Sequence, residues 1–349
     1  MMRYNAPASS FKLKKAYFLF LLCLTVVLAP SLHAASESLD QLHEKAKKEG
    51  GKLMLYAPLS ARAMEVILPA FMKRFPGVTI DHIDATSDKL IARVVAELRG
   101  GRVLADVISG ALSYLPQMIE QKFLAPLINI PEAAAYPAQM KGDVWIATDT
   151  QFYVAGWNTN LVKKGDEPKG FEDLANAKWK DNLMGEPRDF QMLVGLAKRK
   201  YNSNEKTIAL FKKIAANQVE FHRGHSQLAE LLVAGQRAVC FTCYSHHFPP
   251  RIKKGAPIQS VLSEGVGEVG GSVAVLKGAP HPNAALLWAR WAVSEEGQRV
   301  YAQAGETPAH PRVEPLEKIR PAKAYMLTVD DVKEFPKYEK LWKEIFQIR

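Results

Sequence analysis

The chain has 349 residues, 48% of them hydrophobic and 23% charged, with 46 Lys and Arg against 36 Asp and Glu. A chain of this length can form two packed domains, at roughly 150 residues per domain. Its basic residues alternate with acids along the predicted helix faces instead of clustering with aromatics, which argues against a nucleic-acid partner.

The first 34 residues have the pattern of a secretory signal peptide. Four basic residues, the last of them Lys15, precede the apolar run 16–29, and Leu32-His33-Ala34 offers a cleavage site before Ala35. The alternative is an uncleaved anchor, but a span needs ~20 apolar residues and this run is shorter. We expect the signal peptide to be removed and the mature chain to be exported to the periplasm. The mature chain then has a net charge of +6, which slightly favours anionic over cationic partners.

The stretch from Lys52 to Ser109 predicts strand, helix, strand, helix and strand in turn. Apolar residues recur at helical spacing over 61–75, Pro76-Gly77 stops that helix, and a second amphipathic helix ends at Gly100-Gly101. Parallel strands joined by helices bring their carboxyl ends to one sheet edge, where ligands bind. Ser60 and Ser109 are candidate ligand-binding residues, because they are short hydrogen-bond donors at that edge. Tyr56 is a further candidate, although it could equally well belong to the core.

Aromatic and β-branched residues over 144–162 predict the next strand, and its part Tyr153–Asn158 is expected to pass into a second lobe. GGSVAVLKGA, from Gly270, predicts a return strand. Two such crossings imply a discontinuous first lobe of residues 35–153 plus about 271–315. A second lobe of 154–270 and a C-terminal helical segment of 316–349 complete the chain. The predicted class is α/β, two-lobed, with hinge strands and a ligand cleft between the lobes.

Further helices are predicted at 111–121, 171–175, 192–200, 205–216, 227–234, 282–291, 294–304 and 332–348. In the second lobe, a short strand is predicted at Leu183-Met184, another is predicted to end at Arg223-Gly224, and the run RAVCFTCY is predicted to form a third.

Enzyme motifs are weak. GxSxG, HExxH and the P-loop are missing, and Gly265–Gly270 fits GxGxxG but precedes a strand-like run, so we interpret it as a turn. We expect no enzymatic activity and no cofactor. An exported hydrolase or transferase stays as the alternative from another class.

Arg188 and Arg223 follow predicted strands of the second lobe. They form either a fork that grips a carboxylate or phosphate, or exposed arginines paired with acids such as Glu186 and Asp189. Other candidate ligand-binding residues at the same edge are Tyr153, Ser226, Tyr244, Ser245 and His246.

Two groups of residues, four histidines and two cysteines, each allow more than one chemical role. His222, His225, His246 and His247 suit either a transition metal or hydrogen bonding to a ligand, and we expect no metal. Cys240 and Cys243 are three residues apart. In one strand their side chains face opposite sides at roughly 10 Å, so we expect two buried small side chains instead of a disulfide, unless a turn begins at Thr242.

The order of these pieces resembles the type 2 periplasmic solute-binding proteins of ATP-binding-cassette importers, in the branch of ferric-ion, thiamine, phosphonate and polyamine binders. The resemblance covers nearly the whole mature chain. It is carried by FMKRFPGVTIDHI, LIARVVAELRGGRVLADVI, FEDLANAKWKDNLM, LAELLVAGQRAV, GGSVAVLKGAPHPNAALLWARWAVSEEGQ and ETPAHP.

The resemblance implies a monomer that holds a small-molecule ligand in its cleft and delivers it to a cognate permease in the inner membrane. From the two arginines we expect a small anionic solute. Ferric-iron binding is the alternative, yet the tyrosine pair of the ferric binders falls at Ser245-His246 here. Tyr56, Tyr153, Tyr244 and His246 are the residues that could form an atypical iron site.

Overall fold

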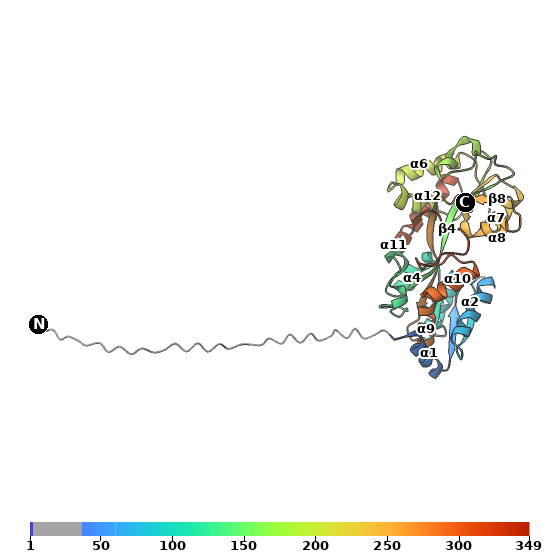
Figure 1. Cartoon of the computed structure of the whole chain (residues 1–349). Helices are drawn as coiled ribbons and strands as arrows, with labels where there is room; N and C mark the ends of the chain where they lie inside the picture. Colours follow the sequence, from blue (N-terminus) through green and yellow to red (C-terminus); the bar gives the residue numbers. More distant parts are fainter. Residues whose placement is uncertain (3–36, 60, 349) are drawn as a thin grey trace. The chain divides into compact units, whose positions relative to one another are not determined.

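The computed structural model describes residues 1–2, 37–59 and 61–348 (Figure 1). The predicted signal peptide lies outside the described residues apart from Met1 and Met2, and so does Ser60. From Glu37 onward the chain forms one folded unit in which strands alternate with helices. None of the helices in the described part combines the length and apolar character that crossing a bilayer requires.

One mixed sheet organises the described part of the chain. Its strands follow the order β2-β1-β3-β9-β4-β7-β5-β6, with β10 paired to β9 and β8 paired to β4. The bounds are β1 Lys52–Tyr56, β2 Thr79–Ile83, β3 Val107–Ser109, β4 Ile146–Asn158, β5 Leu183–Gly185, β6 Glu220–Phe221, β7 Val239–Tyr244, β8 Ile258–Ser260, β9 Glu264–Val275 and β10 Lys323–Met326.

Helices cover this sheet, and short 3-10 turns, labelled η, connect several of them. The α-helices are α1 Leu39–Lys48, α2 Ala61–Arg74, α3 Ser87–Arg99, α4 Leu115–Glu120, α5 Gln191–Gly195, α6 Asn204–Ala215, α7 His225–Ala234, α8 Phe248–Ile252, α9 Pro282–Val293, α10 Glu295–Ala304, α11 Val329–Val332 and α12 Phe335–Phe346. The turns used below are η1 Leu112–Tyr114, η4 Glu172–Ala175 and η7 Ser245–His247, together with the π-helical turn η6 Leu196–Lys200.

The predicted run from Lys52 to Ser109 is confirmed. Strand β1 pairs in parallel with β2 on one side and with β3 on the other, and α2 and α3 form the crossovers. Helix α3 buries Leu90, Ile91 and Val94, the apolar face that its sequence predicts. Strands β1 and β3 therefore end at one edge of the sheet, as a binding site after their carboxyl ends requires.

Strands β4 and β9 run antiparallel through the middle of the sheet, and they join its two halves (Figure 1). Strands are thus observed at both predicted crossings, but the interpretation of Gly265–Gly270 as a turn is wrong, because this run is the first half of β9. Its glycines fit a crowded strand. A Cβ on Gly267 would lie 2.8 Å from the ring of Phe152, and a Cβ on Gly265 would lie 2.6 Å from Pro321.

The expectation of two unlinked cysteines is also wrong, since Cys240 and Cys243 form a disulfide inside β7. Opposite β4, Cys240 pairs with Gly156 and Cys243 with Val154, so three steps along β7 match two along β4. This bulge brings the two Cα atoms to 5.9 Å, within the range that a disulfide bridges, where a regular strand would separate them further.

The end of the chain is less helical than predicted. Strand β10 adds to β9 before α11 and α12 follow, and α12 packs against α5 and α6. The indole of Trp342 donates to Pro187 O at 2.9 Å, and its ring contacts Phe211 and Phe241. Two predicted helices also differ: 171–175 is the short turn η4, and 192–200 divides into α5 and η6.

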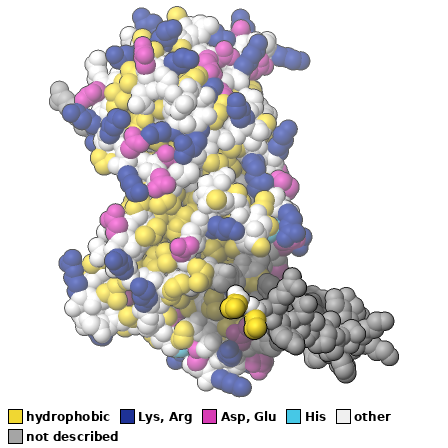
Figure 2. Space-filling model, turned by 90° about the vertical axis from the view of Figure 1, so that its left-hand side faces the viewer, with side chains coloured by type: hydrophobic (Ala, Val, Ile, Leu, Met, Phe, Trp, Pro, Cys, Tyr) yellow, Lys and Arg dark blue, Asp and Glu magenta, His cyan; other side chains and the backbone are white. Residues whose placement is uncertain are grey.

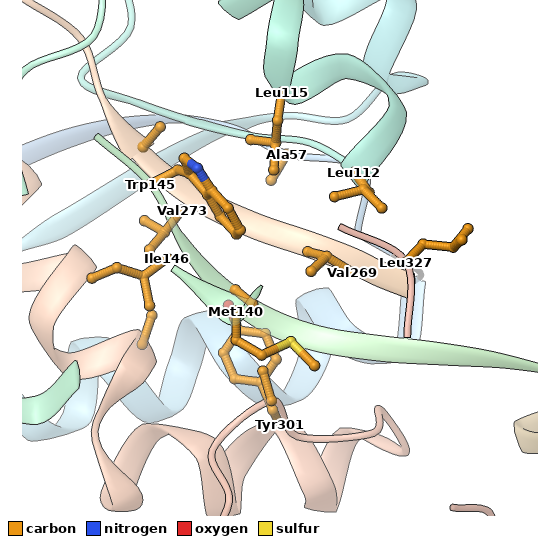
Figure 3. Packing of buried hydrophobic residues seen from close by; sticks show 14 of the residues in the cluster. Ala57, Leu112, Leu115, Met140, Trp145, Ile146, Val269, Val273, Tyr301 and Leu327 are labelled. Atoms are coloured by element: carbon orange, nitrogen blue, oxygen red, sulfur yellow. The ribbon is translucent and has the colours of Figure 1, made fainter. Parts of the chain in front are cut away.

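An apolar core lies where the central strands meet the helices of the first half. Figure 3 shows Val273 of β9 beside Ile146 of β4, and Val269 of β9 toward Leu112 of η1, with Tyr301 contributed by α10. At the surface, Lys and Arg are spread among Asp and Glu over the face in Figure 2 instead of forming one basic patch. This matches the alternation seen in the sequence.

Candidate functional site

A cavity of about 470 Å³ lies at the middle of the sheet, a volume suited to a small molecule. Its lining comes from the ends of β1, β3 and β7, from the first turn of α7, and from the central parts of β4 and β9. The corresponding residues are 57–59, Ser109, Tyr244 with His246 and His247, 224–226, 148–151 and 270–273. Both halves of the sheet therefore contribute to one site.

Four of the predicted ligand-binding residues line this cavity: Ser109, Ser226, Tyr244 and His246. Ser109 ends β3 and Ser226 lies in the first turn of α7, so each sits at an element end that the strand–helix pattern placed at the sheet edge. Tyr244 ends β7 and His246 belongs to η7 directly after it. Ser60, predicted beside them, lies outside the described residues.

Three other predicted residues are held beneath or beside the cavity. Tyr56 is buried between β1 and α3, where its hydroxyl donates to Glu97 Oε1 at 2.7 Å and accepts from Arg93 Nε at 3.0 Å. Tyr153 is buried as well and donates to Glu268 Oε1 at 2.8 Å. Ser245 is 1% exposed, and its Oγ has no hydrogen-bond partner among the described atoms. None of the three is a lining residue.

The predicted arginine fork is not formed in the cavity. Arg188 points outward, with 66% of its side chain exposed, and pairs with Glu186, whose Oε1 lies 2.6 Å from Arg188 Nη2. Arg223 is exposed and is not a lining residue. The alternative stated above, an exposed arginine paired with Glu186, is therefore the observed arrangement for Arg188. Among the described residues, no Lys or Arg lines the cavity.

The structure adds Asp149 to the site, a residue that the sequence did not single out. It lies in β4 between two register shifts against β9, and its half-buried carboxylate faces the cavity. Burial raises the pKa of Asp149 to about 6, although Thr148 Oγ1 donates to its Oδ2 at 3.1 Å and the Gly271 backbone N–H donates as well. An acid inside a strand-like run was the available signal.

A second addition is the group of rings around Tyr244. His225, at the start of α7, lies flat on Tyr244 with ring centroids 3.7 Å apart, and its Nε2 is 3.1 Å from both carboxylate oxygens of Asp189. Burial raises the pKa of Asp189, and His225 opposes that shift. The Tyr244 hydroxyl donates to Tyr153 at 3.4 Å. The cavity wall is thus fixed from behind by a buried polar network.

The neighbouring imidazoles are neutral at physiological pH. Burial, followed by the nearby His247, lowers the pKa of His246 to about 3, while burial and Arg251 lower the pKa of His247 to about 4. Neutral imidazole can both donate and accept a hydrogen bond. These two side chains therefore offer the ligand hydrogen bonds without charge.

Of the four residues named above for an atypical iron site, Tyr153, Tyr244 and His246 lie close together and Tyr56 lies apart from them. Tyr56 is held by Glu97 and Arg93, away from the cavity lining. Burial raises the pKa values of Tyr153 and Tyr244 well above their ordinary range, and Glu268 adds to both shifts, so the phenols stay protonated. In the described part of the chain, no three His, Cys, Asp or Glu side chains are grouped as metal ligands.

Several known proteins are similar to this chain. A relative from Haemophilus influenzae, named only as an uncharacterized protein, is 26% identical over 275 residues, covering 74% of this chain and 77% of the relative. Among solved structures, an ABC transporter substrate-binding protein from Bradyrhizobium japonicum matches with a TM-score of 0.71 at 18% identity, over 85% of this chain and 100% of that chain.

Two further structures share the fold. Iron-bound HitA from Pseudomonas aeruginosa has a TM-score of 0.68 at 20% identity, covering 84% of this chain and 99% of its own. AfuA from Actinobacillus pleuropneumoniae, solved with fructose-6-phosphate bound, has 0.66 at 22%, covering 86% and 99%. The fold is thus the two-lobed one of periplasmic binding proteins. The profile of bacterial extracellular solute-binding proteins matches residues 67–326. The chain belongs to the family of bacterial extracellular solute-binding proteins.

Proposed function

We propose that the chain is the solute-binding component of an ATP-binding-cassette importer. It captures a small polar solute in the cavity and delivers it to an inner-membrane permease, without transforming it. The observation that carries this proposal is a single cavity lined from both halves of the sheet, by strand ends and a helix start. Such a lining favours capture by closure, because contacts from both sides exist only when the solute is enclosed.

The lobes are proposed as residues 35–153 with about 271–315, and residues 154–270. Strands β4 and β9 are the hinge in this proposal, since among the strands of the described residues these two pair with both halves of the sheet. Removal of residues 1–34 would release the mature protein into the periplasm as a monomer. The anionic solute was expected because of Arg188 and Arg223. Neither arginine lines the cavity, so this reason for an anionic solute no longer holds.

Thermal-shift screening of the mature chain tests this function. A solute at 100 times its dissociation constant stabilises the folded state by ~2.7 kcal/mol, which raises the Tm by roughly 5 °C. Ser226→Trp, at an exposed lining position, fills the cavity without entering the core and is expected to abolish the shift while leaving the Tm of the free protein unchanged. Shifts of equal size in Ser226→Trp would exclude the cavity as the binding site.

Ferric-iron transport is the second candidate. Two phenol oxygens lie 3.4 Å apart, in Tyr244 of the cavity lining and in the buried Tyr153 behind it, and iron-bound HitA shares the fold. Binding would require both phenols to lose protons that burial now retains. Titration with ferric citrate should then produce a tyrosinate-to-iron absorbance band in the visible. A flat spectrum would remove this candidate.

A further inference from the structure

A second, smaller cavity adjoins the main one. Its volume is about 130 Å³, and two of its lining residues, His246 and Glu306, also line the main cavity. The two cavities therefore meet at these two side chains. We call the smaller cavity the annex, and its other described lining residues come mainly from α8, from the end of α10 and from the segment 315–319.

Apolar side chains form most of the annex wall among the described residues. Ala302 and Ile319 are 2% and 3% exposed, so this part of the wall lies inside the fold. The apolar lining residues are Pro249, Pro250, Ala302, Pro315, Leu316 and Ile319. An apolar cavity of roughly 150 Å³ binds benzene, so the annex has room for a ring or a chain of about four to six carbons.

Leu316 marks the open side of the annex, since 66% of it is exposed. An apolar group that enters the annex would cover part of this side chain. That exchange is favourable, because apolar surface of both the group and Leu316 leaves water. Lys253 and Glu317 also line the annex, but they pair with each other, so their charges offset and do not require a charged ligand.

The annex is bounded by both halves of the fold. Helix α8 follows β7 of the second half, whereas α10 packs against α2 and α9 of the first half. A group held in the annex would therefore contact both proposed lobes, as the solute in the main cavity does. Occupation of the annex would stabilise the same closed arrangement.

We propose that the captured solute is amphipathic. Its polar part lies in the main cavity, where Ser226, Tyr244 and His246 offer hydrogen bonds, and its apolar group of about four to six carbons lies in the annex. This inference rests on the proposed function and adds the ligand class to it.

The test compares solutes that share a polar head and differ in the length of the tail. Methyl and hexyl β-D-glucoside, methyl and hexyl phosphate, and tetramethylammonium and hexyltrimethylammonium cover neutral, anionic and cationic heads. Calorimetric titration measures their affinities for the mature chain and for three variants. Ala302→Leu fills the annex, and Leu316→Asp places a charge at its open side. Ile128→Asp is the control, at a position that is 58% exposed and is not a lining residue of either cavity.

A further probe, 1-hexanol, has the tail without the head. Its binding is followed by the methyl resonances of Ile319 and Leu316 in the methyl-labelled mature chain. This measurement reports on the annex itself, whichever head the main cavity accepts.

We expect at least one hexyl compound to bind about 10- to 100-fold more tightly than its methyl partner, since each buried CH₂ group raises the affinity about fourfold. Ala302→Leu and Leu316→Asp should each remove most of this ratio, and Ile128→Asp should leave it unchanged. 1-Hexanol should shift the methyl resonances of both reporter residues. If Ala302→Leu does not fold, Leu316→Asp tests the same point at an exposed position.

Four results would overturn the inference. Equal affinities of the hexyl and methyl compounds, or methyl resonances that 1-hexanol leaves unshifted, would exclude an apolar group in the annex and leave the proposed function standing. A hexyl advantage that persists in both annex variants would place the tail elsewhere. Failure of every solute in this set and in the broader thermal-shift screen would remove the proposed function and, with it, the inference.

Discussion

The ring of His225 lies flat on the ring of Tyr244, with centroids 3.7 Å and planes 14° apart. His225 begins α7 and Tyr244 ends β7, so the contact joins two elements that both line the cavity. Asp189, 3% exposed, holds the imidazole from behind at 3.1 Å. This pair therefore fixes the shape of one cavity wall.

His225→Ala is expected to destabilise the protein by about 3 kcal/mol, because it leaves the buried Asp189 carboxylate without its partner. Chemical denaturation at pH 7 measures the loss. The effect should shrink at pH 4, where Asp189 can take up a proton, since burial raises its pKa.

His222→Ala is the matched control. His222 pairs with Glu220 at 2.6 Å near the surface, and such pairs contribute less than about 1 kcal/mol. Equal losses in the two variants would show that the buried pair does not stabilise this wall.

The disulfide inside β7 gives a second prediction. Replacing Cys240 and Cys243 by Ala opens a very short loop, for which the chain-entropy estimate is about 2 kcal/mol. The bulge it closes lies directly before Tyr244, so faster hydrogen exchange is expected in residues 244–247 as well. Treatment of the wild type with reductant should reproduce both effects. Unchanged exchange in 244–247 would mean that the bulge persists without the bond.

Gly267 offers a test of the crowded strand β9. A Cβ there would lie 2.3 Å from Met326 Sδ and 2.8 Å from the buried ring of Phe152. Gly267→Ala should therefore cost about 1 to 3 kcal/mol through overpacking. Gly110→Ala is the control, because its nearest neighbour lies 4.0 Å away. A neutral effect of Gly267→Ala in urea unfolding would show that β9 can shift to accommodate the methyl group.

Stability should depend on pH through His246. Burial lowers the pKa of His246 from the ordinary 6.5 to about 3. Between these two pH values, His246 is protonated in the unfolded chain but stays neutral in the folded chain. The free energy of unfolding then falls as the pH decreases through this range.

His246→Gln removes this contribution. Relative to pH 8, the wild type should lose about 1 to 2 kcal/mol more than the variant at pH 5, as urea unfolding can show. Parallel losses in the two proteins would indicate that His246 is protonated in the folded state.

Much of the fold was predictable because its signals are local. Apolar spacing in α3 and the glycines that follow it determine a helix and its end, and the run from Lys52 to Ser109 folds as expected. The disulfide was not predictable from spacing, since it depends on a bulge. That bulge appears only in the pairing of Cys240 with Gly156 and of Cys243 with Val154.

The site was predictable in position but not in charge. Strand ends and the start of α7 bring Ser109, Ser226, Tyr244 and His246 to the cavity. Which side chains turn inward depends on tertiary partners. Arg188 turns to solvent because Glu186 binds it, and Asp149 faces the cavity because two glycines of β9 leave room for its carboxylate.

Hydrogen–deuterium exchange with and without the most stabilising solute tests the central claim most directly. If the solute is captured in the cavity, protection should appear together in segments of both halves: 57–59, 148–151 and 270–273 on one side, 224–226 and 244–247 on the other. Protection confined to one half, or located away from these segments, would contradict capture between them.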